Sequence, residues 1–421
     1  MENRFKMTLV IVTLNHQSQI DICGSCEDIQ NILCALGATC QGNSGQIATY
    51  QKCSQEIKDN LKKLIPLDKN NHVFGKLYNI FKNMDCEDLF AVLPKKLTDD
   101  EIKIVRDGIL RRTLGDQYEN YVDYYNNCWK DIDDNYEMIC FKNGDNKMHS
   151  IGEKERSKRI CRFCGLKIPN TSFDSKSHSI SEALGNKIIV TNDECDDCNA
   201  NFGEHIERDL INYLDFFRVY FGIQGKGGQA QLVSSDFKIS KDDNQDVISF
   251  EIPEENIKLN KDNSVELTLK HPQKINMQNI YRALVKYALS VLDSSCLEHF
   301  KDTIKWIKRE SSCSQLSWVT ILLTNEKSDS FPEIKVFVRK NDNKVLPFSF
   351  VVLDIDGLRL IAVLPLSDQD TCSFDNEADF NGFWNLLKAY HQIPILKKFQ
   401  PQKDEAQDIT YTIFCNQIND Q

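Results

Sequence analysis

The chain has 421 residues, of which 41% are hydrophobic and 27% are charged, and its formal net charge is −11. This length exceeds what one ordinary hydrophobic core supports, so we expect two or three domains. The acidic balance argues against a protein that coats DNA through its overall electrostatic field. Binding to nucleic acid would need a local basic groove, or a bound cation that offsets the phosphates.

The 16 cysteines favour a reducing compartment over a disulfide framework, because no secretory signal is recognisable. The apolar segment Met7–Leu14 is short and lacks a small-residue cleavage site after it, and its Val, Ile and Thr content predicts a strand. No apolar run approaches the roughly 18 residues that a membrane helix needs. We expect a cytoplasmic protein without membrane contact, in which most cysteines are free thiols and a subset bind metal.

Residues 1–152 predict an N-terminal α+β domain whose role the sequence does not define. Within it, Thr98 is followed by three acidic residues, which is typical of a capped helix start. Apolar residues then recur at helical spacing, and Leu114-Gly115 predicts the helix end. These apolar positions are Ile102, Val105, Ile109 and Leu110.

Two cysteine pairs at C-x-x-C spacing mark a central module over residues 153–232. They are Cys161 and Cys164, then Cys195 and Cys198. Each pair offers two thiolates from one tight turn, which is the spacing that a tetrahedral Zn²⁺ accepts. One pair alone would also fit a redox site, and four packed free thiols are the alternative. Two pairs together predict a structural four-cysteine zinc site.

The segments "CRFCG", "SHSISEALGNK" and "ECDDCNANFG" together resemble the HNH endonuclease superfamily with its ββα-metal finger. They are most similar to the bacterial branch in which a four-cysteine zinc holds the finger. The resemblance covers about residues 161–203. It implies that His178 is the general base and that Asn199 holds a catalytic Mg²⁺ or Mn²⁺ ion. Asn192 matches the middle asparagine, which orients the histidine, and Asn186 is a competitor for that role.

Two positions depart from the family pattern. Many HNH fingers have a carboxylate or a second histidine just before the base, where this chain has Ser177, a poor metal ligand. Three carboxylates remain as substitutes, or the cation rests on Asn199, water and substrate alone. They are Asp174, Glu182 and Glu207. The proline after H-x-I is replaced by Ser181, a minor change.

Other features of the module have two interpretations each. Residues 199–220 predict one long helix with a core-facing stripe. The glycine-rich segment Gly222–Gln229 is a flexible turn, or a turn whose amides and Lys226 approach a phosphate. Lys158, Arg159 and Arg162 form a basic patch that contacts phosphate or is simply solvated.

Residues 233–421 predict a C-terminal α+β domain. "NIYRALVKYALSVLD", from Asn279, predicts an amphipathic helix, and four later segments predict strands. Asp354-Ile355-Asp356-Gly357 predicts a hairpin turn between the last two of these strands. The predicted fold class is therefore α+β, with a central zinc-pinned, treble-clef-like ββα-metal finger between two larger α+β regions.

The resemblance implies a metal-dependent endonuclease that acts on DNA, with RNA as a second substrate class to test. In the family context we expect bacterial anti-phage defence or restriction, with a regulatory protein partner or an oligomer controlling cleavage. The alternative is a non-catalytic zinc finger that binds nucleic acid or protein. His178 and Asn199 favour the enzyme, whereas Ser177 and the acidic charge favour the binding module.

Overall fold

The computed structural model describes residues 5–14, 16–41, 44–67, 73–144, 148–225, 227–242, 247–260, 264–324 and 331–416. The chain forms two compact units, residues 1–125 and 126–421. Both units mix helices and strands, which confirms the predicted α+β class. The three-part division predicted at residues 152 and 232 stays a prediction. The described part of the chain contains no helix with the length and apolarity needed to span a membrane.

In the first unit, an antiparallel sheet has the strand order β2-β1-β6-β5. Alternate residues of β1 pack into two different hydrophobic cores. Leu9 and Ile11 face the helices α1–α3, while Val10 and Val12 face α4. The capping box of Thr98 and the end at Gly115 confirm the predicted α4. The elements are β1 (Phe5–Val12), β2 (Gln17–Gly24), α1 (Cys26–Ala35), β3 (Thr39–Gln41), β4 (Ser44–Gln46), β5 (Tyr50–Lys52), α2 (Gln55–Leu64), α3 (Val73–Lys82), β6 (Leu89–Leu93), α4 (Asp99–Leu114) and α5 (Tyr118–Cys128).

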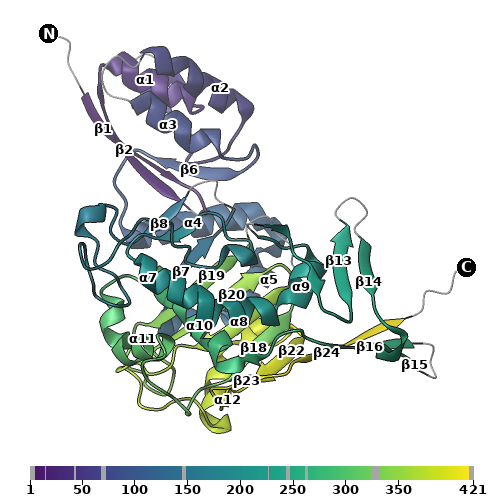
Figure 1. Ribbon diagram of the computed structural model, residues 1–421. Coiled ribbons are helices and arrows are strands. Elements are labelled where there is room, and N and C mark those ends of the chain that lie inside the picture. The colour runs from purple at the N-terminus through teal and green to yellow at the C-terminus, as the bar shows by residue number, and fades with distance from the viewer. Residues whose placement is uncertain are drawn as a thin grey trace, which may run out of the picture. The chain divides into compact units, whose positions relative to one another are not determined.

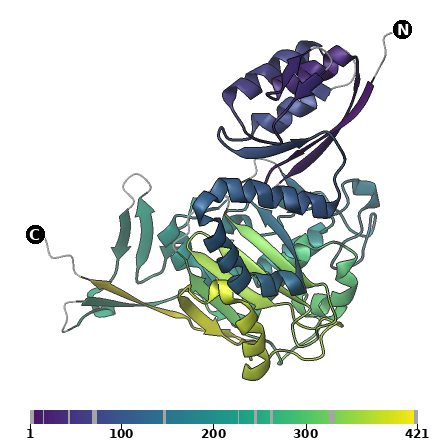
Figure 2. The ribbon, with the colours of Figure 1, turned by 180° about the vertical axis from the view of Figure 1, so that it is seen from behind.

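In the second unit, a six-stranded antiparallel sheet has the order β22-β18-β21-β20-β19-β7 (Figures 1 and 2). Its members are β7 (Tyr136–Lys142), β18 (Val319–Leu323), β19 (Glu333–Arg339), β20 (Ser349–Ile355), β21 (Leu358–Val363) and β22 (Ile395–Phe399). The predicted hairpin turn joins β20 to β21, where Gly357 has φ +72°. One face packs on α6 (Lys130–Asn135) and α12 (Glu377–Leu386). The other face packs on α10 (Met277–Val291).

All residues of α10 are buried, including Gln278, Arg282 and Lys286. The helix is therefore not solvated on one side, as an amphipathic helix would be. The reason is its position. The sheet covers one side, and the π-helical segment Gly203–Glu207 and the helix α8 (Arg208–Tyr213), which follow α7 (Asp196–Phe202) in the cysteine-rich module, cover another (Figure 1). This arrangement builds the cysteine-rich module directly onto the core of the unit.

Smaller sheets surround this body, and the ribbon of β16 and β24 projects from it (Figure 1). The remaining elements are β8 (His149–Ile151), β9 (Ile189–Thr191), α9 (Asp215–Phe221), β10 (Gln224–Gly225), β11 (Gly228–Gln229), β12 (Leu232–Val233), β13 (Lys238–Asp242), β14 (Val247–Glu251), β15 (Ile257–Leu259), β16 (Ser264–Lys270), β17 (Ile275–Asn276), α11 (Lys301–Ile307), β23 (Ala406–Gln407) and β24 (Thr410–Asn416).

Candidate functional site

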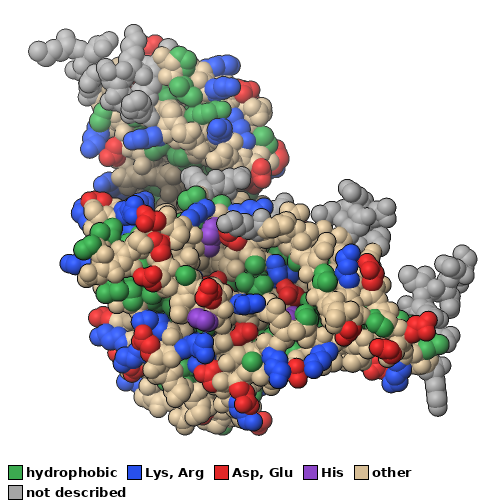
Figure 3. Space-filling model, in the orientation of Figure 1, with side chains coloured by type: hydrophobic (Ala, Val, Ile, Leu, Met, Phe, Trp, Pro, Cys, Tyr) green, Lys and Arg blue, Asp and Glu red, His purple; other side chains and the backbone are tan. Residues whose placement is uncertain are grey.

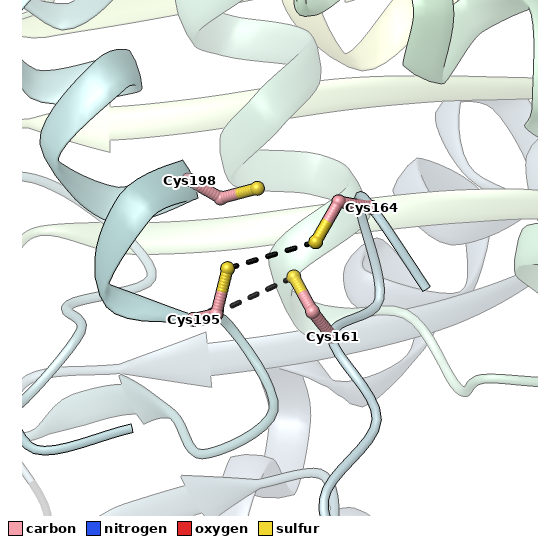
Figure 4. Close-up of side chains that lie close together, drawn as sticks. All are labelled: Cys161, Cys164, Cys195 and Cys198. Carbon is pink, nitrogen blue, oxygen red and sulfur yellow. Dashed lines mark hydrogen bonds between the residues drawn. The ribbon is translucent and has the colours of Figure 1, made fainter. Parts of the chain in front are cut away.

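The four predicted cysteines converge, and their sulfur atoms all lie within 4.8 Å of one another (Figure 4). The Sγ atoms of Cys164 and Cys195 are 3.7 Å apart. Four sulfurs bound to zinc at about 2.3 Å would be separated by about 3.8 Å in a tetrahedron, so the cluster fits Zn²⁺. Among the described residues, no other group of three or more His, Cys, Asp or Glu side chains meets this spacing. The structure therefore supports a zinc site at the predicted position.

Local backbone geometry places these sulfurs. In the first knuckle, the Gly165 amide donates to the Cys161 carbonyl at 2.8 Å, and Gly165 has φ +72°, which favours glycine. In the second, Cys195 is the N-cap of α7, and Cys198 lies in its first turn. A hydrogen bond from the Cys198 thiol lowers the pKa of Cys161 to about 5 and raises the pKa of Cys198. The thiolate form of Cys161 is thus stabilised, whereas burial raises the pKa of Cys164 to about 11.

The segment around His178 runs beside β9 as a short antiparallel pair. The Ser179 amide donates to Ile189 at 3.0 Å, and the Thr191 amide donates to Ser177 at 2.9 Å. Because side chains alternate along an extended segment, Ser177 and Ser179 point into the core and are buried. His178 faces the other way, with 12% of its side chain exposed. Together with α7, this gives a strand, strand and helix in the order of a ββα finger.

His178 opens into a groove of about 950 Å³, which Asn199 also lines. One part of the groove lining is a stripe of residues along the helical stretch that begins with α7. These residues are Asn199, Gly203, Glu207 and Ile211. Glu182 and glycines of the β10–β11 hairpin also line the groove, while Lys226 lies outside the described residues. The structure therefore brings the proposed base and the proposed cation ligand into one groove.

The two candidate middle asparagines have different surroundings. Asn186 is fully buried, and its amide group donates to the carbonyls of Ile180 and Ile189 at 2.8 Å each. Its oxygen accepts from the Ile188 and Ile189 amides. Asn192 is half-buried, is hydrogen-bonded to Ser150, and does not line the groove. Asn186 thus holds the loop after His178, whereas Asn192 connects the end of β9 to β8.

The three carboxylates considered as metal ligands are also distinguished by position. Asp174 is exposed, pairs with Arg156 and is not part of the groove. Glu182 lines the groove, and its Oε1 lies 3.1 Å from His178 Nε2. Glu207 lines it as well, from a π-helical segment, Gly203–Glu207. Ser177 is turned away and donates a hydrogen bond to the Glu194 carbonyl at 3.3 Å.

Asp196, at the start of α7, is a positioning residue that the sequence did not reveal. Its carboxylate accepts hydrogen bonds from the backbone amides of Asp174 and Ser175, both at 2.9 Å, and from the hydroxyls of Ser172 and Ser175. Burial raises the pKa of Asp196, but these hydrogen bonds outweigh burial and hold the pKa well below its usual range. The carboxylate fixes the loop that leads to His178.

The prediction that Arg162 belongs to an exposed basic patch is wrong. Its side chain is 1% exposed, pairs with Asp193 at 2.8 Å and donates to the carbonyls of Leu289, Ser290 and Leu292 at the end of α10. It therefore caps a helix instead of contacting phosphate or solvent. On the face shown in Figure 3, basic and acidic side chains of the second unit are interspersed instead of forming one basic surface. The face shown therefore offers no broad basic surface for phosphate.

Residues 161–215 match the family model described as HNH endonuclease. The predicted resemblance is confirmed. The matched segment contains the cysteine cluster, His178, Asn199 and Glu207, so a nuclease-type domain with an implied affinity for nucleic acid lies in the second unit. No curated protein and no solved structure matches the chain.

One charged residue outside the HNH segment reaches its interior. Lys286 of α10 has no exposed side-chain surface, and its Nζ lies 2.9 Å from Glu207 Oε1 and 3.2 Å from Glu194 Oε2. Burial lowers the pKa of Lys286, but both carboxylates outweigh burial, so the pKa is raised and the ammonium stays charged. Burial also raises the pKa of Glu194, to about 7. The sequence showed only a lysine in an apolar helix.

Proposed function

We propose that this protein is a metal-dependent endonuclease that hydrolyses DNA phosphodiester bonds, with His178 as the general base. The observation that carries the proposal is that His178 and Asn199, to which the motif resemblance assigns the base and the cation ligand, line one groove in the same segment as the four-cysteine cluster. A purely structural zinc finger needs neither residue. RNA is the competing substrate class.

His178 would accept a proton from the attacking water. Imidazole suits this role because its ordinary pKa, near 6.5, leaves it mostly neutral at physiological pH. Protonation creates an imidazolium, and the Glu182 carboxylate at 3.1 Å from Nε2 stabilises that charge. Lys176 also lines the groove and would offset phosphate charge locally, whereas Arg218 in the same lining is paired with Asp215.

Asn199, Glu182 and Glu207 line the groove, and their side-chain oxygens are the hard donors that would hold Mg²⁺ or Mn²⁺. When bound, such a cation polarises the scissile phosphate and stabilises the leaving oxygen. The zinc has a different role, because four thiolates leave it no open position. It would hold the finger so that His178 and Asn199 face the same phosphate.

From the resemblance alone we further propose a role in bacterial anti-phage defence or restriction, in the cytoplasm, with a protein partner or an oligomer controlling cleavage. The second candidate function is a zinc finger that binds nucleic acid or protein without catalysis. The burial of Ser177 favours it, because the position that supplies a metal ligand in many HNH fingers faces the core.

Plasmid cleavage tests the proposal. Wild type, His178→Ala and His205→Ala are incubated with supercoiled DNA and Mg²⁺, Mn²⁺ or EDTA. His205 is an exposed histidine on the helical stretch that carries Asn199, and it does not line the groove. It is therefore a matched control. We expect His178→Ala to cut about 10²–10⁴-fold more slowly, and His205→Ala to cut like wild type.

Equal, EDTA-resistant cutting by wild type and His178→Ala would contradict the assignment. Metal-dependent cutting of a matched RNA but not of DNA would change the substrate class. Binding of DNA without cleavage under all of these conditions would favour the non-catalytic module.

A further inference from the structure

Lys286 joins three parts of the finger from outside it. Its Nζ lies 3.3 Å from the His178 carbonyl oxygen, in addition to its ion pairs with Glu194 and Glu207. His178 is the proposed base and lies in the extended segment beside β9, and Glu194 directly precedes the knuckle residue Cys195. Glu207 ends the π-helical segment and lines the groove. One ammonium group therefore connects the base strand, the zinc knuckle and the groove wall.

Stability does not by itself account for this arrangement. A fully buried lysine is rare, and an apolar side chain of similar volume often stabilises a core as well as a buried ion pair does. An ammonium instead offers three donors at one point, which matches three partners on three segments. What the apolar side chain would not supply is a fixed distance between the His178 backbone and the Glu207 carboxylate.

We propose that Lys286 is a positioning residue of the nuclease site, which sets the placement of His178 and Glu207 within the groove. The proposal rests on the proposed function. It assigns to α10, outside the matched segment, part of the geometry that catalysis requires. Sub-ångström to 1 Å displacements of catalytic groups are enough to slow a reaction severely.

The test compares Lys286→Met with Arg282→Met. Arg282 lies one turn earlier on α10, is equally buried, and pairs with Asp404 without contacting the groove. The experiment measures kcat and KM on plasmid DNA, bound zinc and the unfolding midpoint. We expect Lys286→Met to lower kcat at least ten-fold, with KM and zinc content within about two-fold of wild type. Arg282→Met should lower the unfolding midpoint but leave kcat per folded molecule unchanged.

A second measurement does not depend on cleavage. With ¹³C-labelled histidine, the His178 ring resonance, identified by its loss in His178→Ala, should shift in Lys286→Met and stay in place in Arg282→Met. If Lys286→Met does not fold, Lys286→Met with Glu194→Gln is compared with Glu194→Gln alone, because this pair removes the cation together with its fully buried partner.

The outcomes separate the two proposals. Wild-type kcat and an unshifted resonance in Lys286→Met would overturn the positioning role while leaving the nuclease intact. Equal losses of kcat in both variants would also overturn it, since they would reflect general damage to α10. A wild-type protein that cleaves no DNA would instead remove the proposed function, and the histidine resonance would still decide the role of Lys286.

Discussion

At the scale of single residues, Asn186 illustrates how one amide side chain can fix a catalytic loop. Its four hydrogen bonds join Ile180, which follows His178 by two residues, to the start of β9. Asn186, Ile180 and Ile189 are buried and Ile188 is half-buried, so most of these groups cannot turn to water when the side chain is lost. The loop after His178 therefore depends on this one residue.

We expect Asn186→Ala to lower the free energy of unfolding by about 3 kcal/mol, because buried backbone groups lose their partners. Asn192→Ala, at the position that the family pattern indicates, should cost less than about 1 kcal/mol, because Asn192 bonds to the exposed Ser150. Urea denaturation of both variants measures the difference. A larger loss of unfolding free energy in Asn192→Ala than in Asn186→Ala would indicate that Asn192 orients the histidine.

The residues of the site differ in how far the sequence could predict them. The cysteines, His178 and Asn199 lie on a local motif, so spacing alone predicted their roles. The burial of Arg162 and Lys286 could not be predicted, because their partners are distant in sequence: Arg162 reaches the end of α10, and Lys286 reaches His178. Charged residues are normally solvated, and only tertiary structure shows the exceptions.

At the scale of elements, the predicted long helix is divided into α7, the π-helical segment, α8 and α9. The predicted core stripe of Phe202, Ile206, Leu210 and Leu214 is buried, and Phe217, predicted one turn further on, is half-buried against the same core. Hydrophobic periodicity predicted that stripe correctly but could not predict the π-helical segment, because one wide turn changes the spacing by a single residue. That turn ends at Glu207, in the groove.

Removing a zinc ligand tests how the cluster supports α7. We expect Cys164→Ser to lower bound zinc well below one equivalent and to lower the unfolding midpoint, because ligand binding stabilises only the folded state. Cys296→Ser is the control, since Cys296 is a half-buried thiol outside the cluster. Elemental analysis and thermal unfolding give the result. Full zinc occupancy in Cys164→Ser would argue against four-cysteine ligation.

At the scale of the whole molecule, the strand β7 connects sequence regions that composition had separated. It lies within residues 1–152, yet all seven of its residues pair with β19 at one edge of the six-stranded sheet. Composition describes each stretch of the chain by itself, whereas sheet membership depends on a pairing nearly 200 residues away in sequence. For this reason the class of the fold could be predicted, and the partners of individual strands could not.

A pair of fragments tests this connection. Residues 126–421 should fold cooperatively and bind about one equivalent of zinc, because they contain the complete second unit. Residues 153–421 lack β7 and would expose the edge of β19, so we expect aggregation or a lower unfolding midpoint. Circular dichroism and size-exclusion chromatography compare them. Equal behaviour of the two fragments would show that β7 is dispensable and would favour a boundary near residue 152.

The complete burial of α10 between the sheet and the finger has a thermodynamic consequence. The sheet and the finger belong to one core around α10. Separating the finger from α10 would therefore expose apolar surface that is otherwise exposed only when the unit unfolds. Any ligand of the groove, whether an oligonucleotide, a cation or an inhibitor, would then raise the melting temperature of residues 126–421 as one body. A thermal-shift screen would thus report occupancy of the groove even for ligands that are never cleaved.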